Sequence, residues 1–243
     1  MKSFIFLILV VTMLSDPRFW AQSSSGNVPI RVILPQGLKP SSCQFKYFLI
    51  GPFGGYGGFA RPKLNASQFE IETVYEGMAV ESLKALLWCS GYQLQTMTFD
   101  SLPASANRTV QVNPTPLGTI RFLGLVRGLT SQNAQVVYVD VDYIPWWVCE
   151  FFGLPDCALG AWRIVSVKLD TDGTFAATLP DFAKDAVISS FQNHGEFAFR
   201  IRDQKTGNPL FELKPVGSRS PLGSVAVADS YPSLQVFDAE LSK

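Results

Sequence analysis

The sequence predicts an all-β protein with two tandem antiparallel β-sandwich domains that follow an export signal. Short segments of alternating apolar and polar residues recur along the chain, and Gly, Pro, Asn and Asp separate them, as is typical of sandwiches. No long helical periodicity interrupts this pattern after the N-terminus. Of the 243 residues, 47% are hydrophobic, which supplies enough apolar surface for a core and excludes general disorder.

The N-terminus has the pattern of a secretory signal peptide, which we place at residues 1–21. Lys2 supplies the positive start, and the apolar run around Phe4–Val11 is too short for the roughly 20 residues that span a bilayer. Cleavage is expected after Ala21 or after Ser15, with an uncleaved anchor or a buried helix as the alternative. We therefore expect an exported protein of the periplasm, the cell surface or the medium, with no transmembrane span in the mature chain.

The first sandwich is expected over residues 22–112, with strands at 30–34, 45–49, 69–75, 83–89, 93–99 and 110–112. In residues 69–75 the aromatic and apolar side chains share one face, and Glu70 and Glu72 share the other, which indicates a half-buried strand. Asn113–Pro116 contains two prolines, which interrupt a ladder and stiffen the chain. We therefore place a linker and domain boundary at 113–116.

The second sandwich is expected over residues 117–215, with strands at 118–125, 135–143, 162–169, 174–179, 196–201 and 210–214. An aromatic insertion at 144–161 interrupts it, and Asp181–Phe191 has room for one short helical turn. Residues 216–243 lose the alternation, so we expect a loosely ordered C-terminal tail there.

The four cysteines are Cys43, Cys89, Cys149 and Cys157. An even number in an exported chain predicts disulfides, and four cysteines allow three pairings. We favour Cys43–Cys89 with Cys149–Cys157, because each bridge then stays inside one expected domain. A zinc site is disfavoured, since no Cys-x-x-Cys pair is present and His194 is the only histidine in the sequence.

One motif resembles a known family. Lys168–Pro180, with Asp172-Gly173-Thr174-Phe175 at its centre, resembles the hairpin of the carboxypeptidase regulatory-like domain, a transthyretin-like β-sandwich of exported bacterial proteins. Gly118–Val126 and Ala134–Val139 occupy the places of that family's first two strands, and Ser82–Tyr92 resembles its late strand ending in a Gly-Tyr turn. The resemblance implies two immunoglobulin-like or transthyretin-like copies, over 28–112 and 117–215, and a non-catalytic role.

Charge and motif content exclude several classes of function. Lys and Arg number 20 and Asp and Glu number 20, so no broad basic surface for nucleic acid is expected. The glycine-rich stretch Gly51–Phe59 lacks Gly-Lys-Ser/Thr and therefore is not a phosphate loop. It presents Tyr56 and two phenylalanines, either as a lid on the core or as a contact loop. We expect no cofactor and no metal.

The insertion holds the main candidate binding residues, Trp146, Trp147, Phe151 and Phe152. If exposed, these aromatics would form a contact patch for a protein or a carbohydrate; otherwise they would pack between the two domains. Asp140 and Asp142 alternate along one expected strand, about 7 Å apart. They form either a solvated face or a carboxylate pair of the kind that glycosidases use.

Together these features favour an exported, non-catalytic binding or surface-scaffolding protein with a protein or carbohydrate partner at the cell surface. One alternative is a carbohydrate-binding module, which requires exposed, coplanar tryptophans beside Asp140 and Asp142. A further alternative is a hydrolase that uses paired carboxylates in a cleft.

Overall fold

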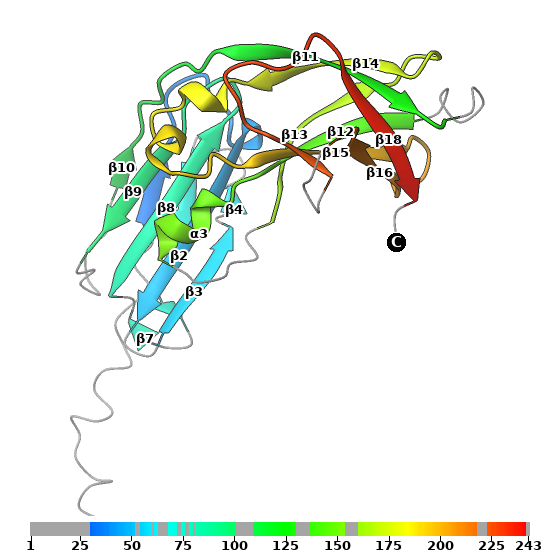
Figure 1. The fold of residues 1–243 in the computed structure, drawn as a ribbon. Coiled ribbons are helices and arrows are strands. Elements are labelled where there is room, and N and C mark those ends of the chain that lie inside the picture. The colour runs from blue at the N-terminus through cyan, green and yellow to red at the C-terminus, as the bar shows by residue number, and fades with distance from the viewer. Residues whose placement is uncertain are drawn as a thin grey trace, which may run out of the picture.

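The computed structural model describes residues 30–51, 54–59, 61–62, 68–71, 74–75, 78–79, 81–100, 109–129, 137–153, 160–217 and 223–241. The expected signal peptide lies outside these residues. β-strands dominate the described chain, and the helical segments are short, so the predicted all-β class is confirmed (Figure 1). Among the described residues, no helix has the length and apolar character needed to cross a membrane.

Two four-stranded sheets form what we call the N-terminal sandwich. One sheet has the order β10 (Thr109–Gln111), β1 (Ile30–Ile33), β5 (Gln68–Ile71) and β4 (Arg61–Pro62). The other has the order β3 (Gly54–Phe59), β2 (Cys43–Gly51), β8 (Ser82–Cys89) and β9 (Gln95–Phe99). Buried side chains from both sheets form one core, in which the rings of Phe45 and Phe69 stack with centroids 5.2 Å apart. A separate hairpin joins β6 (Val74–Tyr75) to β7 (Met78–Ala79).

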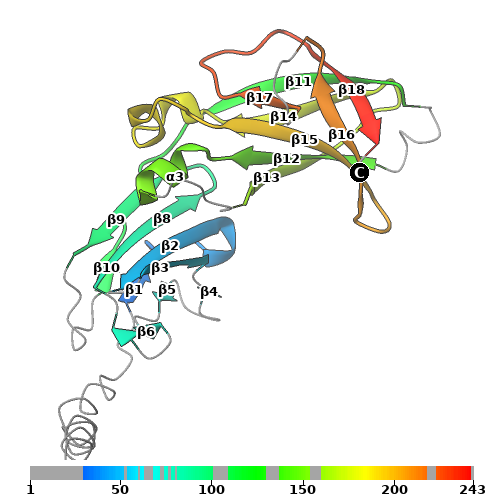
Figure 2. The ribbon, with the colours of Figure 1, turned by 60° about the horizontal axis from the view of Figure 1, so that its bottom comes forward.

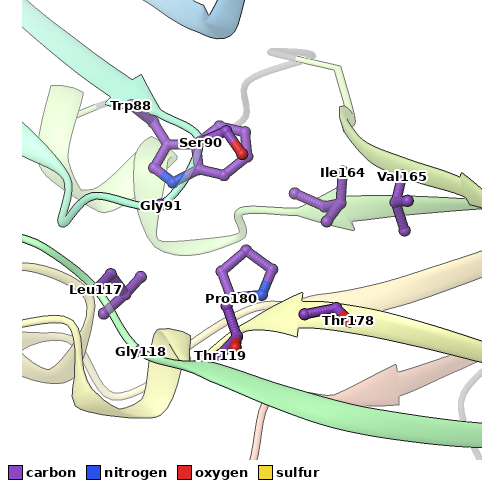
Figure 3. A pocket seen from close by; sticks show the side chains of 10 residues that line it. All are labelled: Trp88, Ser90, Gly91, Leu117, Gly118, Thr119, Ile164, Val165, Thr178 and Pro180. Atoms are coloured by element: carbon purple, nitrogen blue, oxygen red, sulfur yellow. The ribbon is translucent and has the colours of Figure 1, made fainter. Parts of the chain in front are cut away.

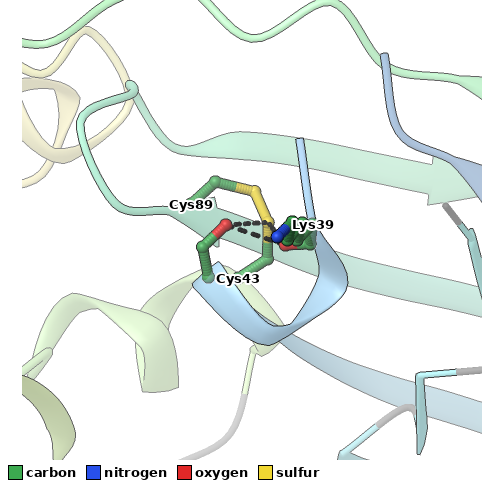
Figure 4. The surroundings of a disulfide bond; sticks show 4 residues. Lys39, Cys43 and Cys89 are labelled. Atoms are coloured by element: carbon green, nitrogen blue, oxygen red, sulfur yellow. Dashed lines mark hydrogen bonds between the residues drawn. A yellow bond between two sulfur atoms is a disulfide. The ribbon is translucent and has the colours of Figure 1, made fainter. Parts of the chain in front are cut away.

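A disulfide joins the two central strands of the second sheet. Cys43 begins β2 and lies opposite Cys89, the last residue of β8, and the two sulfurs are bonded as we expected (Figure 4). Cys149 is also disulfide-bonded. Cys157, its expected partner, lies outside the described residues.

Strand β8 is buried on both of its faces, which differs from the half-buried sheet that we expected. Leu83, Ala85 and Leu87 enter the core of the N-terminal sandwich. Leu86 and Trp88, which point the other way because side chains alternate along a strand, enter a larger core shared with the second half of the chain.

The second half forms one eight-stranded sheet, which we call the C-terminal sheet. Its order is β13 (Trp162–Lys168), β12 (Val137–Ile144), β15 (Glu196–Asp203), β16 (Pro209–Pro215), β18 (Gln235–Leu241), β11 (Thr119–Arg127) and β14 (Thr174–Pro180), and β17 (Ser224–Ala226) pairs with β15. The sheet curls, so that β11 and β14 pass over β12 and β13 (Figure 2). Rings from four of its strands, Phe122, Phe175, Phe199 and Phe237, pack together inside the curl.

The C-terminal residues differ from the loose tail that we expected. Residues 223–241 contain β17 and β18, and β18 lies between β16 and β11 with Phe237 fully buried. Residues 235–241 do alternate in the manner of a strand. The Gly-, Pro- and Ser-rich stretch before them hides that alternation when the sequence is read alone.

The proline-containing segment at 113–116 is fixed by hydrogen bonds to the turn between β8 and β9. The backbone N–H of Gln93 donates to the Thr115 carbonyl over 2.7 Å, and the N–H of Leu117 donates to the Gly91 carbonyl over 2.9 Å. Tyr92 and Pro116 form an isolated β-bridge between these two bonds. The path from the N-terminal sandwich to the C-terminal sheet is therefore held in place at Thr115–Leu117.

Candidate functional site

The aromatic insertion contains a helix where we expected only a loop. α3 (Trp147–Phe152) follows β12 and ends at Gly153, whose left-handed backbone, with φ of 72°, suits glycine. Trp147 and Phe152 are 1% and 3% exposed, whereas Trp146, which precedes the helix, is 41% exposed. Phe151 is half-buried. Of the four candidate contact residues, Trp146 is therefore the one presented to solvent.

Trp147 is held by a short hydrogen-bond chain inside the core. Its indole Nε1 donates to the Tyr143 hydroxyl over 2.7 Å, and that hydroxyl donates to the His194 carbonyl over 2.6 Å. Burial raises the pKa of the Tyr143 phenol well above its ordinary value, so the hydroxyl remains a donor. His194 takes part through its backbone carbonyl.

The insertion packs against the outer face of the β2–β8 layer, and we call this contact region the junction. Phe152 of α3 meets Phe48 of β2 with ring centroids 5.7 Å apart. Trp162 of β13 stacks on Trp88 of β8 at 6.0 Å and an interplanar angle of 17°. In Figures 1 and 2, α3 lies between the C-terminal sheet and strands β2 and β8. The insertion thus joins the two halves of the chain, which is the burial alternative stated above.

Two lysines from the N-terminal sandwich complete the junction. Lys84 of β8 donates to the Phe151 carbonyl over 2.9 Å, and its ammonium lies 5.6 Å from the centre of that ring. Lys46 of β2 donates to the Gly160 carbonyl over 3.2 Å and lies 5.1 Å from the centre of the Trp162 ring. Lys46 is 1% exposed, and its burial lowers its pKa to about 7.

Asp140 and Asp142 do not form the solvated face that we expected, because arginines cover them. Both aspartates are nearly buried, at 3% and 4% exposure. Arg163 of β13 contacts both, at 2.6 Å from Asp140 Oδ2 and 2.5 Å from Asp142 Oδ1. Across the other edge of β12, Arg202 contacts Asp140 at 3.0 Å and Arg200 contacts Asp142 at 3.4 Å.

This arrangement of charges suits a structural role better than acid–base chemistry. Each carboxylate has two arginine partners, and Asp140 also accepts a hydrogen bond from Ser166 Oγ over 2.6 Å. The guanidinium groups of Arg163, Arg200 and Arg202 thus occupy all four oxygens of the two carboxylates. The exposed, paired tryptophans that a carbohydrate-binding module would place beside these aspartates are also not found in the described insertion, since Trp147 is buried.

The remaining candidate residues lie apart from the junction. Tyr56 belongs to β3, an edge strand where we expected a loop, and its side chain lies outside the described residues. Asp172 accepts hydrogen bonds from the backbone and hydroxyl of Thr174, and Gly173 has φ of 84°, as in a tight turn. No cluster of three or more His, Cys, Asp or Glu side chains placed to hold a metal ion occurs in the described part of the chain.

The candidates predicted from the sequence did not include the residues that receive the insertion, which are Lys46, Lys84, Trp88 and Trp162. A signal for the two lysines was present. Each interrupts an apolar strand, Lys46 between Phe45 and Tyr47 and Lys84 between Leu83 and Ala85. A cation at such a position requires a partner from another element, and the sequence does not say which element supplies it.

No protein-family model matches the chain, and no curated protein sequence matches it. Among solved structures, a Bacteroides ovatus protein named as a putative adhesin is similar over 91% of this chain and 92% of its own, with 9% identity and a TM-score of 0.27. A streptococcal ancillary pilin is similar over 89% of this chain and 63% of its own, with 11% identity and a TM-score of 0.29.

The shaft pilin SpaA of Lactobacillus rhamnosus GG is similar over 87% of this chain and 98% of its own, with 8% identity and a TM-score of 0.23. At such low scores and identities these similarities do not establish a shared fold or function. The all-β assignment rests on the strands and sheets of the chain itself.

Proposed function

We propose that the chain is an exported, non-catalytic surface protein, in which two β-domains meeting at residues 113–116 act as one rigid scaffold. The exposed Trp146 is the centre of its contact surface for a protein or carbohydrate partner. The proposal of one rigid scaffold rests on the contacts in the junction. Its aromatic and charged side chains are engaged in holding the two halves of the chain together, at Phe152–Phe48, Trp162–Trp88 and Lys84–Phe151.

Export is supported by two independent observations. The first is the charged start followed by an apolar run in residues 1–14. The second is the disulfide between Cys43 and Cys89, because such bonds persist mainly in oxidising compartments outside the cytoplasm. A protein with this signal and bond is expected in the periplasm, at the cell surface or in the medium.

The contact surface is proposed at Trp146 because the described part of the chain exposes few large apolar side chains. Trp146, Val216 and Leu234 are each more than 40% exposed, and Trp146 is the one that carries an aromatic ring. Tryptophan is enriched where protein interfaces are strongest, since it buries a large area and keeps a polar N–H.

Export is tested by expressing the full chain in a bacterial host and locating it by fractionation. We expect a periplasmic or secreted protein that begins near residue 22 and shows no reactive thiol on alkylation. A cytoplasmic protein that retains residues 1–21 and free thiols would contradict the export proposal.

The contact surface is tested by binding of the purified protein to a glycan and polysaccharide panel and to extracellular matrix proteins. The variant Trp146→Ala removes the ring, and Leu234→Ala is the matched control because its side chain is 43% exposed. We expect a bound partner whose affinity falls at least tenfold in Trp146→Ala and is unchanged in Leu234→Ala. Equal binding by both variants and the wild type would refute the assignment to Trp146.

A further inference from the structure

The C-terminal sheet offers its outer face, rather than an edge or its interior, for contact with another protein. β13 and β14, the first and last strands in its order, approach each other beside a small pocket of about 210 Å³ (Figure 3). Their approach leaves no room for an added strand between them. The inner face of the sheet is filled by its buried aromatic core. A partner of this sheet would therefore lie on its outer face.

Apolar side chains cover part of this outer face. Leu123 and Leu125 of β11 alternate with residues that are buried in the core, so they point outward, where both are half-buried. Val236 of β18 lies opposite Leu125 on the neighbouring strand and is also half-buried. Val216 follows β16, donates its backbone N–H to the Val236 carbonyl over 2.8 Å, and is 45% exposed. We call Leu123, Leu125, Val216 and Val236 the apolar patch.

The patch gives β11 apolar side chains on both of its faces. An antiparallel sheet with one face in water usually has polar side chains on that face. β12 of the same sheet follows this rule, because its outward side chains include Asp140 and Asp142. β8 is apolar on both faces, and both are covered, one by the core of the N-terminal sandwich and the other by the junction. By the same reasoning, the patch is expected to be covered in the assembled protein.

Exposed charges lie at the two ends of the patch. At one end, Arg127 of β11 lies directly opposite Asp238 of β18, and both side chains are exposed. Neither of them forms an ion pair with a side chain of the described chain. At the other end, Arg121 of β11 is exposed on the same face as Arg127. The patch thus has a positive and a negative group side by side at one end and a positive group at the other.

We infer that a second copy of this chain covers the patch, so that the protein is a dimer in which two C-terminal sheets stack face to face. The twofold axis lies between β11 and β18 and is parallel to them, which agrees with the nearly aligned strands of packed sheets. Each β11 then lies over β18 of the partner subunit. Leu125 meets Val236 of the partner subunit, and Arg127 meets Asp238 of the partner subunit, and each of these contacts occurs twice.

The charges select this orientation and this occupant. A twofold axis across the strands, through the middle of the patch, would instead place Arg127 over Arg121 of the partner subunit, and like charges in contact disfavour association. With the axis parallel to the strands, one surface supplies both members of the ion pair, as an interface between identical chains requires. None of these residues belongs to the aromatic insertion. Failure of the dimer would therefore leave the contact surface proposed at Trp146 unaffected.

The test is sedimentation velocity of the purified exported protein and of two charge-reversal variants. We expect the wild type to be a dimer at micromolar concentrations. Arg127→Asp and Asp238→Arg each bring like charges together twice in the interface, so each variant alone should dissociate with a dissociation constant raised at least a hundredfold. Lys39→Asp makes a similar change of charge at an exposed position of the N-terminal sandwich and should remain dimeric.

Mixing the two variants makes the test decisive. In an equimolar mixture of Arg127→Asp and Asp238→Arg, every aspartate of one chain faces an arginine of the other, so a heterodimer with the affinity of the wild type should form. Its formation also shows that both variants are folded. The inference is overturned if the wild type is a monomer at these concentrations, if the single variants remain dimeric, or if their mixture does not associate.

A dimer that is equally weakened by Lys39→Asp would overturn the placement of the interface on this face.

Discussion

Replacing Lys46 by methionine is expected to remove a specific pH dependence from the free energy of unfolding. In the folded chain the pKa of Lys46 is lowered from 10.5 to about 7, because burial disfavours the ammonium. Between these two values the unfolded chain binds a proton that the folded chain does not. Unfolding is then linked to proton uptake, so stability must rise with pH across this window.

The expected slope of the free energy of unfolding against pH follows from the one proton that the unfolded chain binds and the folded chain does not. A full difference of one bound proton changes the free energy of unfolding by about 1.4 kcal/mol per pH unit. Near pH 8–9, where Lys46 is mostly neutral when folded and charged when unfolded, the wild type should approach this slope. Above about pH 10 the trend should reverse, because burial raises the pKa of Tyr231 to about 12 and the unfolded phenol ionises first.

The assay is urea denaturation followed by tryptophan fluorescence at several pH values between 7 and 10. Lys46→Met should flatten the rise, since methionine keeps the length of the side chain and does not titrate. Lys84→Met, which removes a lysine from the neighbouring strand of the same junction, should retain it. A wild type whose stability does not change over this range would refute the burial of Lys46 as the structure places it.

Three further predictions concern packing and charge. Gly124→Ala should cost about 1–3 kcal/mol of stability, because its Cβ would overlap the Phe175 ring, whereas Gly118→Ala meets nothing closer than 4.0 Å and should be nearly neutral in thermal melts. The double variant Cys43→Ser/Cys89→Ser should lose roughly 4 kcal/mol, the chain-entropy value for a separation of 46 residues, and equal stability with and without the bond would contradict it. Arg163→Met removes a partner of both buried aspartates and should cost about 2–3 kcal/mol, against under about 1 kcal/mol for Arg31→Met, whose partner Glu70 is only half-buried. Comparable losses in the two arginine variants, measured by urea denaturation, would show that the aspartate cluster contributes no more than a surface ion pair.

The strands could be predicted where one face is apolar and the other polar. β14, with Phe175, Ala177 and Leu179 buried and the intervening residues outside, is an example. β3 was missed because its glycines have no side chains from which an alternation could be recognised. α3 was missed because six residues are fewer than two turns, too few to show a helical period.

The candidate site was harder to predict than the fold, because the alternation of apolar and polar residues does not show which side chains contact one another in the folded chain. The aromatics of the insertion were visible in the sequence, and both burial and exposure were open for them. Burial of these aromatics depends on Phe48, Lys84 and Trp88. These three residues lie on one face of two strands, more than fifty residues earlier in the chain. Asp140 and Asp142 alternate like a solvated face, and arginines on two neighbouring strands cover them instead. Such contacts are set by the order of strands in the sheet, which local sequence does not encode.

The position of β18 has a consequence for the timing of folding. Strand β11, near the start of the C-terminal sheet, pairs with β14 on one edge and with β18 on the other, and more than a hundred residues separate β11 from β18. A ribosome must therefore synthesise residue 237 before Phe237 can close the aromatic core around Phe122 and Phe199. Until then the edge of β11 that receives β18 is unpaired, and an intermediate with such an edge and exposed apolar surface is prone to aggregate.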